Sequence, residues 1–130
     1  VYLCYGIHHL MNVVTHREDV PHAVLIRALE PLEGIEEMLL RRGKQSFHPS
    51  LTAGPGALSE ALGIRTVHTG YSLLGPELFI EDRDIRVPVR KIVASTRVGV
   101  SYAGPDALRP YRFYIAGNNF VSKGKGLPLP

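Results

Sequence analysis

The 130-residue sequence contains a single cysteine, Cys4, which excludes an intramolecular disulfide and favours a reducing compartment. It has no apolar run of the roughly 18 residues that a membrane-spanning helix needs. It also has no HExxH, CxxC or clustered-Asp pattern, and the adjacent His8 and His9 would point to opposite faces of a strand. Neither a membrane segment nor a metal site is therefore predicted.

Negative charge is scarce in the last third of the chain. Residues 1–82 carry six Lys or Arg against ten Asp or Glu, a net charge of −4, whereas residues 83–130 carry nine against two, a net charge of +7. This asymmetry is typical of a domain whose C-terminal part faces a polyanion, and the alternative is a solvated basic surface. Hydrophobic residues make up 45% of the chain, which is enough for one packed domain.

The order of apolar and turn-forming residues predicts a single α+β domain with a curved, mixed or antiparallel sheet of open-barrel type. Two helices are predicted, Pro31–Arg42 and Pro55–Leu62. The predicted strands are Val1–Tyr5, Ile7–Thr15, Ala23–Leu29, Leu78–Ile80, Ile85–Val87, Ile92–Val100 and Tyr111–Ala116. We expect residues 1–117 to form the domain and residues 118–130 to be a loose tail.

The chain opens with Val1 inside an apolar, β-prone stretch, so we expect it to be part of a larger domain. Two polar residues interrupt apolar segments. Arg27 lies within AVLIRAL, where its guanidinium needs a carboxylate in the core or marks a functional site. Asn12 lies within HHLMNVV, where its amide either bridges to neighbouring backbone or lines a ligand pocket.

Several stretches, in order, resemble one family: VYLCYGIHHLMNVV, AVLIRALEPLEGIEEM, LTAGPGALSEALGI, STRVGVSYAG and PYRFYIAG. This series is similar to the alkyladenine (3-methyladenine) DNA glycosylases from Val1 to about Gly117. The resemblance implies base-excision repair, in which an alkylated or deaminated purine is flipped out of duplex DNA and its N-glycosidic bond is hydrolysed. It implies no metal and no other cofactor.

The resemblance also assigns site residues. Tyr5 and Gly6 match the family's Tyr-Gly motif, whose tyrosine wedges into the gap that the flipped nucleotide leaves. Asn12 matches the asparagine that rejects the 2-amino group of guanine. Arg27 matches the arginine that holds the attacking water, and the Val98 carbonyl lies beside that water in the RVG motif, where Gly99 permits close approach. Asn12, Arg27 and Val98 should therefore line one pocket.

Two features depart from the family pattern. The family's general base is a glutamate upstream of the first matched strand, with a tyrosine and a histidine that stack on the flipped base, and these positions do not occur in the 130 residues. Many relatives also have a lysine where this chain has Ala57, which removes one phosphate contact. The backbone of Gly54 and Gly56, before a helix, remains a candidate phosphate contact.

The predicted partner is damaged double-stranded DNA, bound by a monomer. The predicted location is the cytoplasm, with the nucleoid, in a bacterium and the nucleus in a eukaryote. A DNA-binding module without chemistry is the alternative, because the glutamate lies outside the sequence. A β-domain that acts on RNA is a third hypothesis, since one fold serves many functions.

Overall fold

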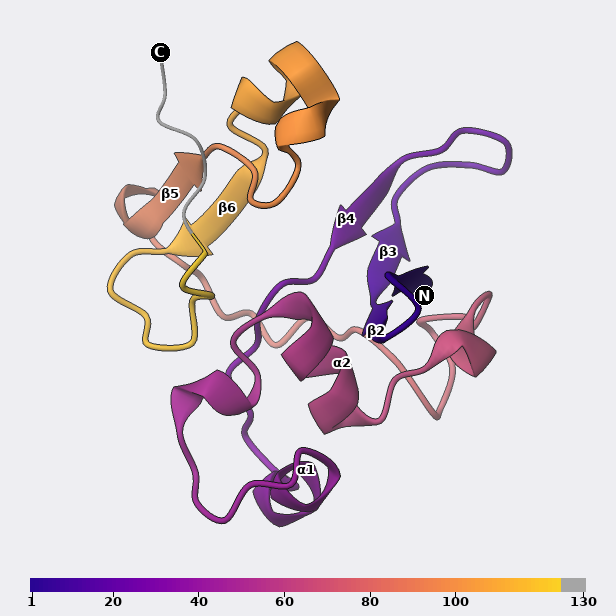
Figure 1. The fold of residues 1–130 in the computed structure, drawn as a ribbon, viewed down its shortest axis with the longest axis vertical. Coiled ribbons are helices and arrows are strands. Elements are labelled where there is room, and N and C mark those ends of the chain that lie inside the picture. The colour runs from indigo at the N-terminus through magenta and orange to yellow at the C-terminus, as the bar shows by residue number, and fades with distance from the viewer. Residues whose placement is uncertain (125–130) are drawn as a thin grey trace.

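The computed structural model describes residues 1–124, in which short antiparallel strands lie beside two α-helices and several 3-10 helices (Figure 1). The strands are β1 (Tyr2–Cys4), β2 (His8–Leu10), β3 (Asn12–Val14), β4 (Ala23–Leu25), β5 (Ile92–Ser95) and β6 (Arg112–Ile115). The helices are α1 (Ile35–Arg41), α2 (Pro55–Leu62) and the 3-10 helices η1 (Pro49–Leu51), η2 (Thr66–His68), η3 (Val89–Lys91) and η4 (Ser101–Leu108). The predicted α+β class is confirmed.

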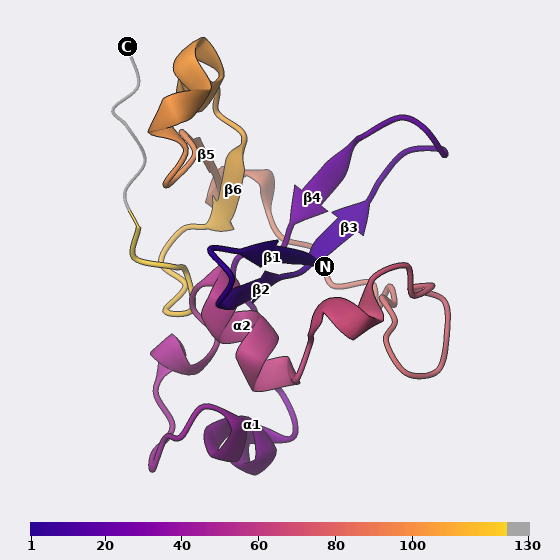
Figure 2. The ribbon, with the colours of Figure 1, turned by 45° about the vertical axis from the view of Figure 1, so that its right-hand side comes forward.

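Each strand of residues 1–124 pairs with one neighbour, in the antiparallel ribbons β1–β2, β3–β4 and β5–β6. The ribbons therefore replace the single curved sheet that the sequence suggested. Figure 2 shows β1 and β2 lying over α2, while the β3–β4 ribbon projects from the body of the molecule. Only Met11 separates β2 from β3 in the sequence, and the β1–β2 and β3–β4 ribbons point in different directions (Figure 2).

Several of the predicted strands differ from the structure. Ile7–Thr15 is divided into β2 and β3, and Leu78–Ile80 forms no strand but only an isolated bridge, between Phe79 and Leu74. Ala23–Leu29 was expected to be a buried strand, but β4 ends at Leu25 and Val24 is 52% exposed, because β3 is the only strand that pairs with β4. The residues after Leu25 turn toward α2 instead, through a bridge between Ala28 and Ala53. Ile85–Val87 forms no strand and is exposed, and the strand predicted over Ile92–Val100 ends at Ser95.

Helix α2 begins and ends where the sequence predicted. Pro55 occupies the first turn, and Gly63 closes the helix with a left-handed φ of 71°. Helix α1 begins four residues later than predicted, at Ile35. Gly34, with φ 70°, precedes it in a left-handed conformation that residues with a side chain rarely adopt, so the turn before Ile35 cannot continue the helix backward.

The hydrophobic core lies between the two helices and η1. Met38, Leu51 and Ala61 are buried there, with Ile35, Leu39 and Leu62 packed against them. The Arg42 guanidinium also links the helices through an ion pair of 2.5 Å with Glu60. Burial of one leucine-sized side chain contributes about 1.5–3 kcal/mol, so these contacts hold the helical part together.

The segment after β6 was expected to be a loose tail, and its residues up to Gly124 contact the rest of the chain. Phe120 packs against Phe47 with ring centroids 6.1 Å apart, and Ser122 is buried. The Ser122 carbonyl accepts a hydrogen bond of 2.8 Å from Arg112. The rest of the expected tail, residues 125–130, lies outside the described residues.

Candidate nucleic-acid interface

Tyr5 and Gly6 form the tip of the β1–β2 ribbon. The Ile7 N–H donates to the Cys4 carbonyl at 3.2 Å, and both intervening residues have positive φ, 52° for Tyr5 and 71° for Gly6. Two positive φ values are the mark of the tight turns that suit the twist of a hairpin. Glycine adopts them freely, whereas a residue with a side chain is strained by roughly 1–2 kcal/mol. Tyr5 is thus held in a strained turn with its side chain 85% exposed.

The β1–β2 ribbon is braced against α2 and η2. A Cβ on Gly56, in the first turn of α2, would lie 2.9 Å from His8 Nδ1, so the absence of a side chain there permits the close contact. On the next residue, His9 Nδ1 accepts the Thr66 N–H at 3.2 Å. These contacts hold the β1–β2 ribbon, and with it the strained turn at Tyr5, against the helices.

The backbone of Arg27 is held by a hydrogen bond, whereas one nitrogen of its side chain has no partner. Its carbonyl accepts the Gly54 N–H at 3.0 Å, which ties it to the residue that precedes α2. Its Nε is buried and has no hydrogen-bond partner within residues 1–124. Burial lowers the pKa of Arg27, and the nearby positive charge of Arg112 lowers it further. One of the two hypotheses for Arg27 was a salt bridge in the core, and no such salt bridge occurs among the described residues.

The hydrogen bond from the Gly54 N–H to the Arg27 carbonyl affects one of the two predicted phosphate contacts. Because the Gly54 N–H donates to Arg27, it is not free to bind a phosphate. Pro55 has no N–H, and Gly56 packs against His8. Gly54 and Gly56 thus pack the Arg27 segment and β1–β2 onto α2, and a phosphate contact at the Gly56 N–H stays a prediction.

Asn12 lies at the start of β3, opposite Leu25 of β4. Its side-chain Nδ2 donates to the Leu10 carbonyl at 3.0 Å, so part of its hydrogen-bonding capacity is used by nearby backbone. Arg27 follows Leu25 by two residues, and the Ile26 N–H still bonds to the Met11 carbonyl at 3.1 Å. Arg27 lies beyond the end of β4, so the strand pairing does not determine on which side of the ribbon its side chain lies relative to Asn12.

Val98 and Gly99 follow β5, in the third ribbon. Val98 is half-buried, and a Cβ on Gly124 would come within 2.6 Å of its Cγ1, so the C-terminal segment passes directly over it. Gly99 is exposed with φ 73°. Within residues 1–124, no hydrogen bond joins either residue to Asn12 or Arg27, and their place in a common pocket stays a prediction.

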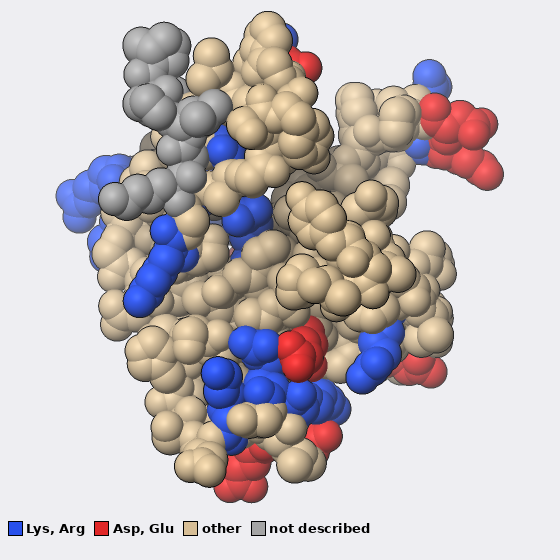
Figure 3. Space-filling model, viewed as in Figure 1, with Lys and Arg blue, Asp and Glu red and all other residues tan. Residues whose placement is uncertain are grey.

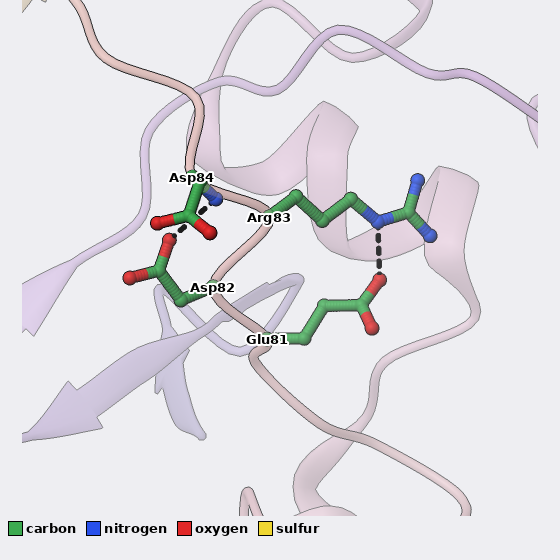
Figure 4. Close-up of polar contacts among 4 residues, drawn as sticks. All are labelled: Glu81, Asp82, Arg83 and Asp84. Atoms are coloured by element: carbon green, nitrogen blue, oxygen red, sulfur yellow. Dashed lines mark hydrogen bonds and ion pairs between the residues drawn. The ribbon is translucent and has the colours of Figure 1, made fainter.

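The basic residues of the C-terminal part divide into two groups. Arg83, Arg86 and Arg109 are paired with Glu81, Asp84 and Asp106 at 2.5, 3.3 and 2.6 Å. Figure 4 shows the first of these pairs, beside the Asp82 carboxylate that accepts the Asp84 N–H at 2.8 Å. The second group has no ion pair within residues 1–124 and consists of Arg90, Lys91, Arg97, Arg112 and Lys123.

We call this second group the unpaired basic cluster, and its residues lie in and around β5 and β6. In the view of Figure 3, basic side chains on the β5–β6 side stand apart from acidic ones, which gather at the tip of β3–β4 and around α1. Sequence reasoning found the charge asymmetry but did not single out Arg112. The only sequence signal for it was its place in PYRFYIAG, which does not reveal its partners.

Other features do not add a second site. A hollow of about 390 Å³ lies at the tip of β3–β4, lined by Val14 and residues 16–21, and neither Asn12 nor Arg27 lines it. Within the described part of the chain, no three His, Cys, Asp or Glu side chains are grouped to hold a metal ion. No helix of residues 1–124 has the length and apolar character to cross a membrane.

An exposed aromatic on a braced ribbon, together with unpaired cations, is typical of a domain that contacts nucleic acid. The model of the methylpurine-DNA glycosylase family matches residues 1–119. The chain therefore belongs to this family.

Similar proteins carry the name "Putative 3-methyladenine DNA glycosylase". The relative from Methanocella arvoryzae is 46% identical over 124 residues, which cover 95% of this chain and 60% of the relative. The relative from Anaeromyxobacter sp. is 49% identical over 127 residues, 97% of this chain and 58% of the relative. The relative from Chlorobaculum tepidum is 41% identical over the whole chain and 60% of its own length. The chain thus spans about 60% of the length of these relatives.

Proposed function

We propose that the protein is a monofunctional DNA glycosylase of base-excision repair that removes alkylated or deaminated purines from duplex DNA. The observation that carries this proposal is the turn at the tip of β1–β2. Tyr5 is 85% exposed, so burial of its ring contributes little to stability that could offset the strain of its turn. Backbone strain of this kind is concentrated at functional sites. On this proposal Tyr5 enters the DNA duplex and fills the gap left by a flipped nucleotide.

The unpaired basic cluster and Arg27 supply the second support. Cations without protein counter-ions are suited to the DNA backbone, whose phosphates dominate affinity. Arg27 retains an N–H without an acceptor, which a water, a phosphate or a substrate oxygen would satisfy. On this proposal Asn12 and Gly99 line the base pocket, Tyr5 and Gly6 form the wedge, and Arg27 and the Val98 carbonyl lie beside the attacking water.

The reaction is hydrolysis. Water attacks C1′ of the damaged nucleotide, the new C1′–O bond forms, and the bond from C1′ to the purine nitrogen breaks with its electron pair leaving on the base. One proton of the water must pass to a general base. Arg27 cannot accept it, because a guanidinium stays protonated, so Arg27 orients the water. The general base is a carboxylate, which the family resemblance assigns to a glutamate that is not among residues 1–130.

The test is single-turnover excision from duplexes that contain hypoxanthine or ethenoadenine. We expect Tyr5→Ala, in a protein extended upstream by the preceding segment of the Methanocella arvoryzae relative, to lower the excision rate about 10- to 100-fold, because each stacked base contributes about 1–3 kcal/mol. Tyr102→Ala is the matched control, since Tyr102 is also a tyrosine and is 83% exposed, but lies in η4. Wild-type protein that releases neither base refutes the proposal.

A DNA-binding module without chemistry is the second candidate, favoured by the lack of a carboxylate beside Arg27 within residues 1–124. A polypeptide of residues 1–130 alone should bind duplex DNA in a salt-dependent way and excise no base, since loss of a general base typically costs about 10²–10⁴-fold. A chimera that adds the preceding segment of the Methanocella arvoryzae relative should restore excision. A chimera that binds without excision supports the module.

A further inference from the structure

The segment after β6 is anchored to two separate parts of the molecule. Phe120 packs on Phe47, in the loop between α1 and η1, with ring centroids 6.1 Å apart. Ser122 is buried, and its carbonyl accepts a hydrogen bond of 2.8 Å from Nη2 of Arg112 in β6. In Figure 1 the yellow segment accordingly runs from β6 toward η1 and returns to the β5–β6 ribbon. We call residues 118–124 the C-terminal strap.

Gly124 of the strap lies directly against Val98, in the loop that follows β5. A Cβ built on Gly124 would come within 2.6 Å of Val98 Cγ1 and 3.6 Å of its Cγ2, so a side chain fits there only if Val98 moves. Gly124 does not have a positive φ, which means that the close approach requires the glycine and the backbone conformation does not. Because valine is stiff at χ1, pressure on Cγ1 is passed to the backbone of Val98.

The strap is also held at the point where the Val98 loop leaves β5. Arg112, which binds the Ser122 carbonyl, pairs in the ladder with Ser95, the last residue of β5 and three residues before Val98. The next residue of the loop is open, since a Cβ added to Gly99 would meet no atom of residues 1–124 within 4 Å. The strap therefore packs on the Val98 side of a loop whose Gly99 side has no neighbour.

We propose that the C-terminal strap is a positioning element for excision, which sets the Val98 backbone and with it the carbonyl beside the attacking water. The proposal deepens the proposed function and rests on it. A group that orients the attacking water must be placed closely, since a shift of about 1 Å costs about 100-fold in rate. The strap acts on the reaction through Val98, so Gly124 and Phe120 are positioning residues.

The test compares variants of the protein extended upstream by the preceding segment of the Methanocella arvoryzae relative, the parent in which excision is measured. Gly124→Ala adds the methyl group that presses on Val98. Phe120→Ala removes the contact with Phe47. Phe113→Ala is its matched control, because Phe113 is a phenylalanine of β6 that is 65% exposed. Each variant is measured for melting temperature, duplex affinity, single-turnover excision and the NMR shifts of the Val98 methyl groups.

We expect Gly124→Ala to shift the Val98 methyl resonances and to lower the excision rate about 10- to 100-fold, with duplex affinity within about twofold of the parent. This split identifies a positioning role, because loss of a DNA contact or of the fold would lower affinity as well. Phe120→Ala should lower the rate by about 3- to 10-fold, since the strap stays tied through Ser122. Phe113→Ala should match the parent.

A double-mutant cycle tests whether the effect passes through the Val98 side chain. In Val98→Ala protein, whose rate is the reference, Gly124→Ala should lower excision by less than about twofold, because Cγ1 is gone and the added methyl group has room. A full loss from Gly124→Ala on this background overturns the proposal.

Unchanged Val98 resonances in Gly124→Ala overturn the proposal, and so do shifted resonances with an unchanged excision rate. Equal losses of affinity and rate overturn it as well, because the strap would then be a DNA contact. If Gly124→Ala does not fold, Phe120→Ala decides by the same split between affinity and rate. A parent that releases neither base refutes the proposed function and the role of the strap with it, whereas excision that is indifferent to both strap variants refutes only the role of the strap.

Discussion

In the helical part of the molecule, Leu58 of α2 is fully buried and Met38 of α1 closes the core beside Ala61. In the ribbons, Tyr5 stands in a strained turn and Arg27 keeps a buried N–H without an acceptor. Buried polar atoms without a hydrogen-bond partner occur in both parts, at Arg42 Nε and Ser59 Oγ in the helical part and at Arg27 Nε after β4, whereas the strained and exposed aromatic occurs in a ribbon. The completely buried Leu58 thus lies in the helical part and the strained, exposed Tyr5 lies in a ribbon, and the two parts are joined where Gly56 packs against His8.

The largest effect on stability is expected from a substitution of a buried side chain in the helical part. Leu58→Ala should lower the free energy of unfolding by about 2–5 kcal/mol, because the side chain is completely buried and leaves a cavity. Leu40→Ala is the control, since Leu40 is 75% exposed, and it should change the free energy by less than about 0.5 kcal/mol. Urea unfolding followed by circular dichroism measures both. Equal losses would contradict the complete burial of Leu58.

The junction between the two parts is tested at Gly56. Gly56→Val should cost about 1–3 kcal/mol, because even a Cβ there would lie 2.9 Å from His8 Nδ1 and the ribbon must move. His8→Ala in the same protein should recover most of that loss, since it removes the atoms that clash. A double-mutant cycle by chemical denaturation measures the coupling. Independent effects of the two substitutions would contradict the contact.

The Arg27 side chain should lower the free energy of unfolding of the DNA-free protein and yet be necessary for excision. Arg27→Met is expected to raise the free energy of unfolding by about 1 kcal/mol, because a buried N–H without a partner costs about 1–3 kcal/mol and solvent screening reduces that figure. The same variant should lose excision.

The pH dependence of this effect follows from the lowered pKa of Arg27. A base whose pKa is lowered by folding destabilises the native state while it is charged, and the cost disappears only as the pH rises through the folded pKa. Arginine stays charged throughout the neutral range, so the gain from Arg27→Met should be constant between about pH 5 and 8. Thermal unfolding at several pH values measures it, and a gain that varies across this range would point to another titrating group.

The smallest expected effect on stability concerns Tyr5. Tyr5→Gly should raise the free energy of unfolding by about 0.5–1 kcal/mol, because glycine adopts a φ of 52° without the strain of a side chain, although its unfolded state has more freedom. Excision and duplex binding should both weaken, since the aromatic side chain is gone. A variant that is less stable than wild type would show that Tyr5 packs on the protein.

Local signals explain what could be predicted about the fold. Pro55 and Gly63 bound α2 because proline and glycine act through their own backbone angles, and the turn at Tyr5-Gly6 needs only its two neighbours. The end of β4 at Leu25 could not be predicted in this way. It depends on whether a second strand covers β4, and the bridge from Ala28 to Ala53 draws the chain toward α2 instead.

The same distinction holds for the candidate site. The sequence by itself determined that Arg27 and Asn12 are polar residues in apolar segments, that Tyr5 precedes a glycine, and that positive charge is concentrated after residue 82. The tertiary structure shows in addition that the Gly54 N–H donates to the Arg27 carbonyl and that the Arg27 Nε is buried without a hydrogen-bond partner within residues 1–124. The reason is physical: residue type and order determine turns and charge, whereas the partner of a buried polar group depends on which distant segments the packed chain brings together.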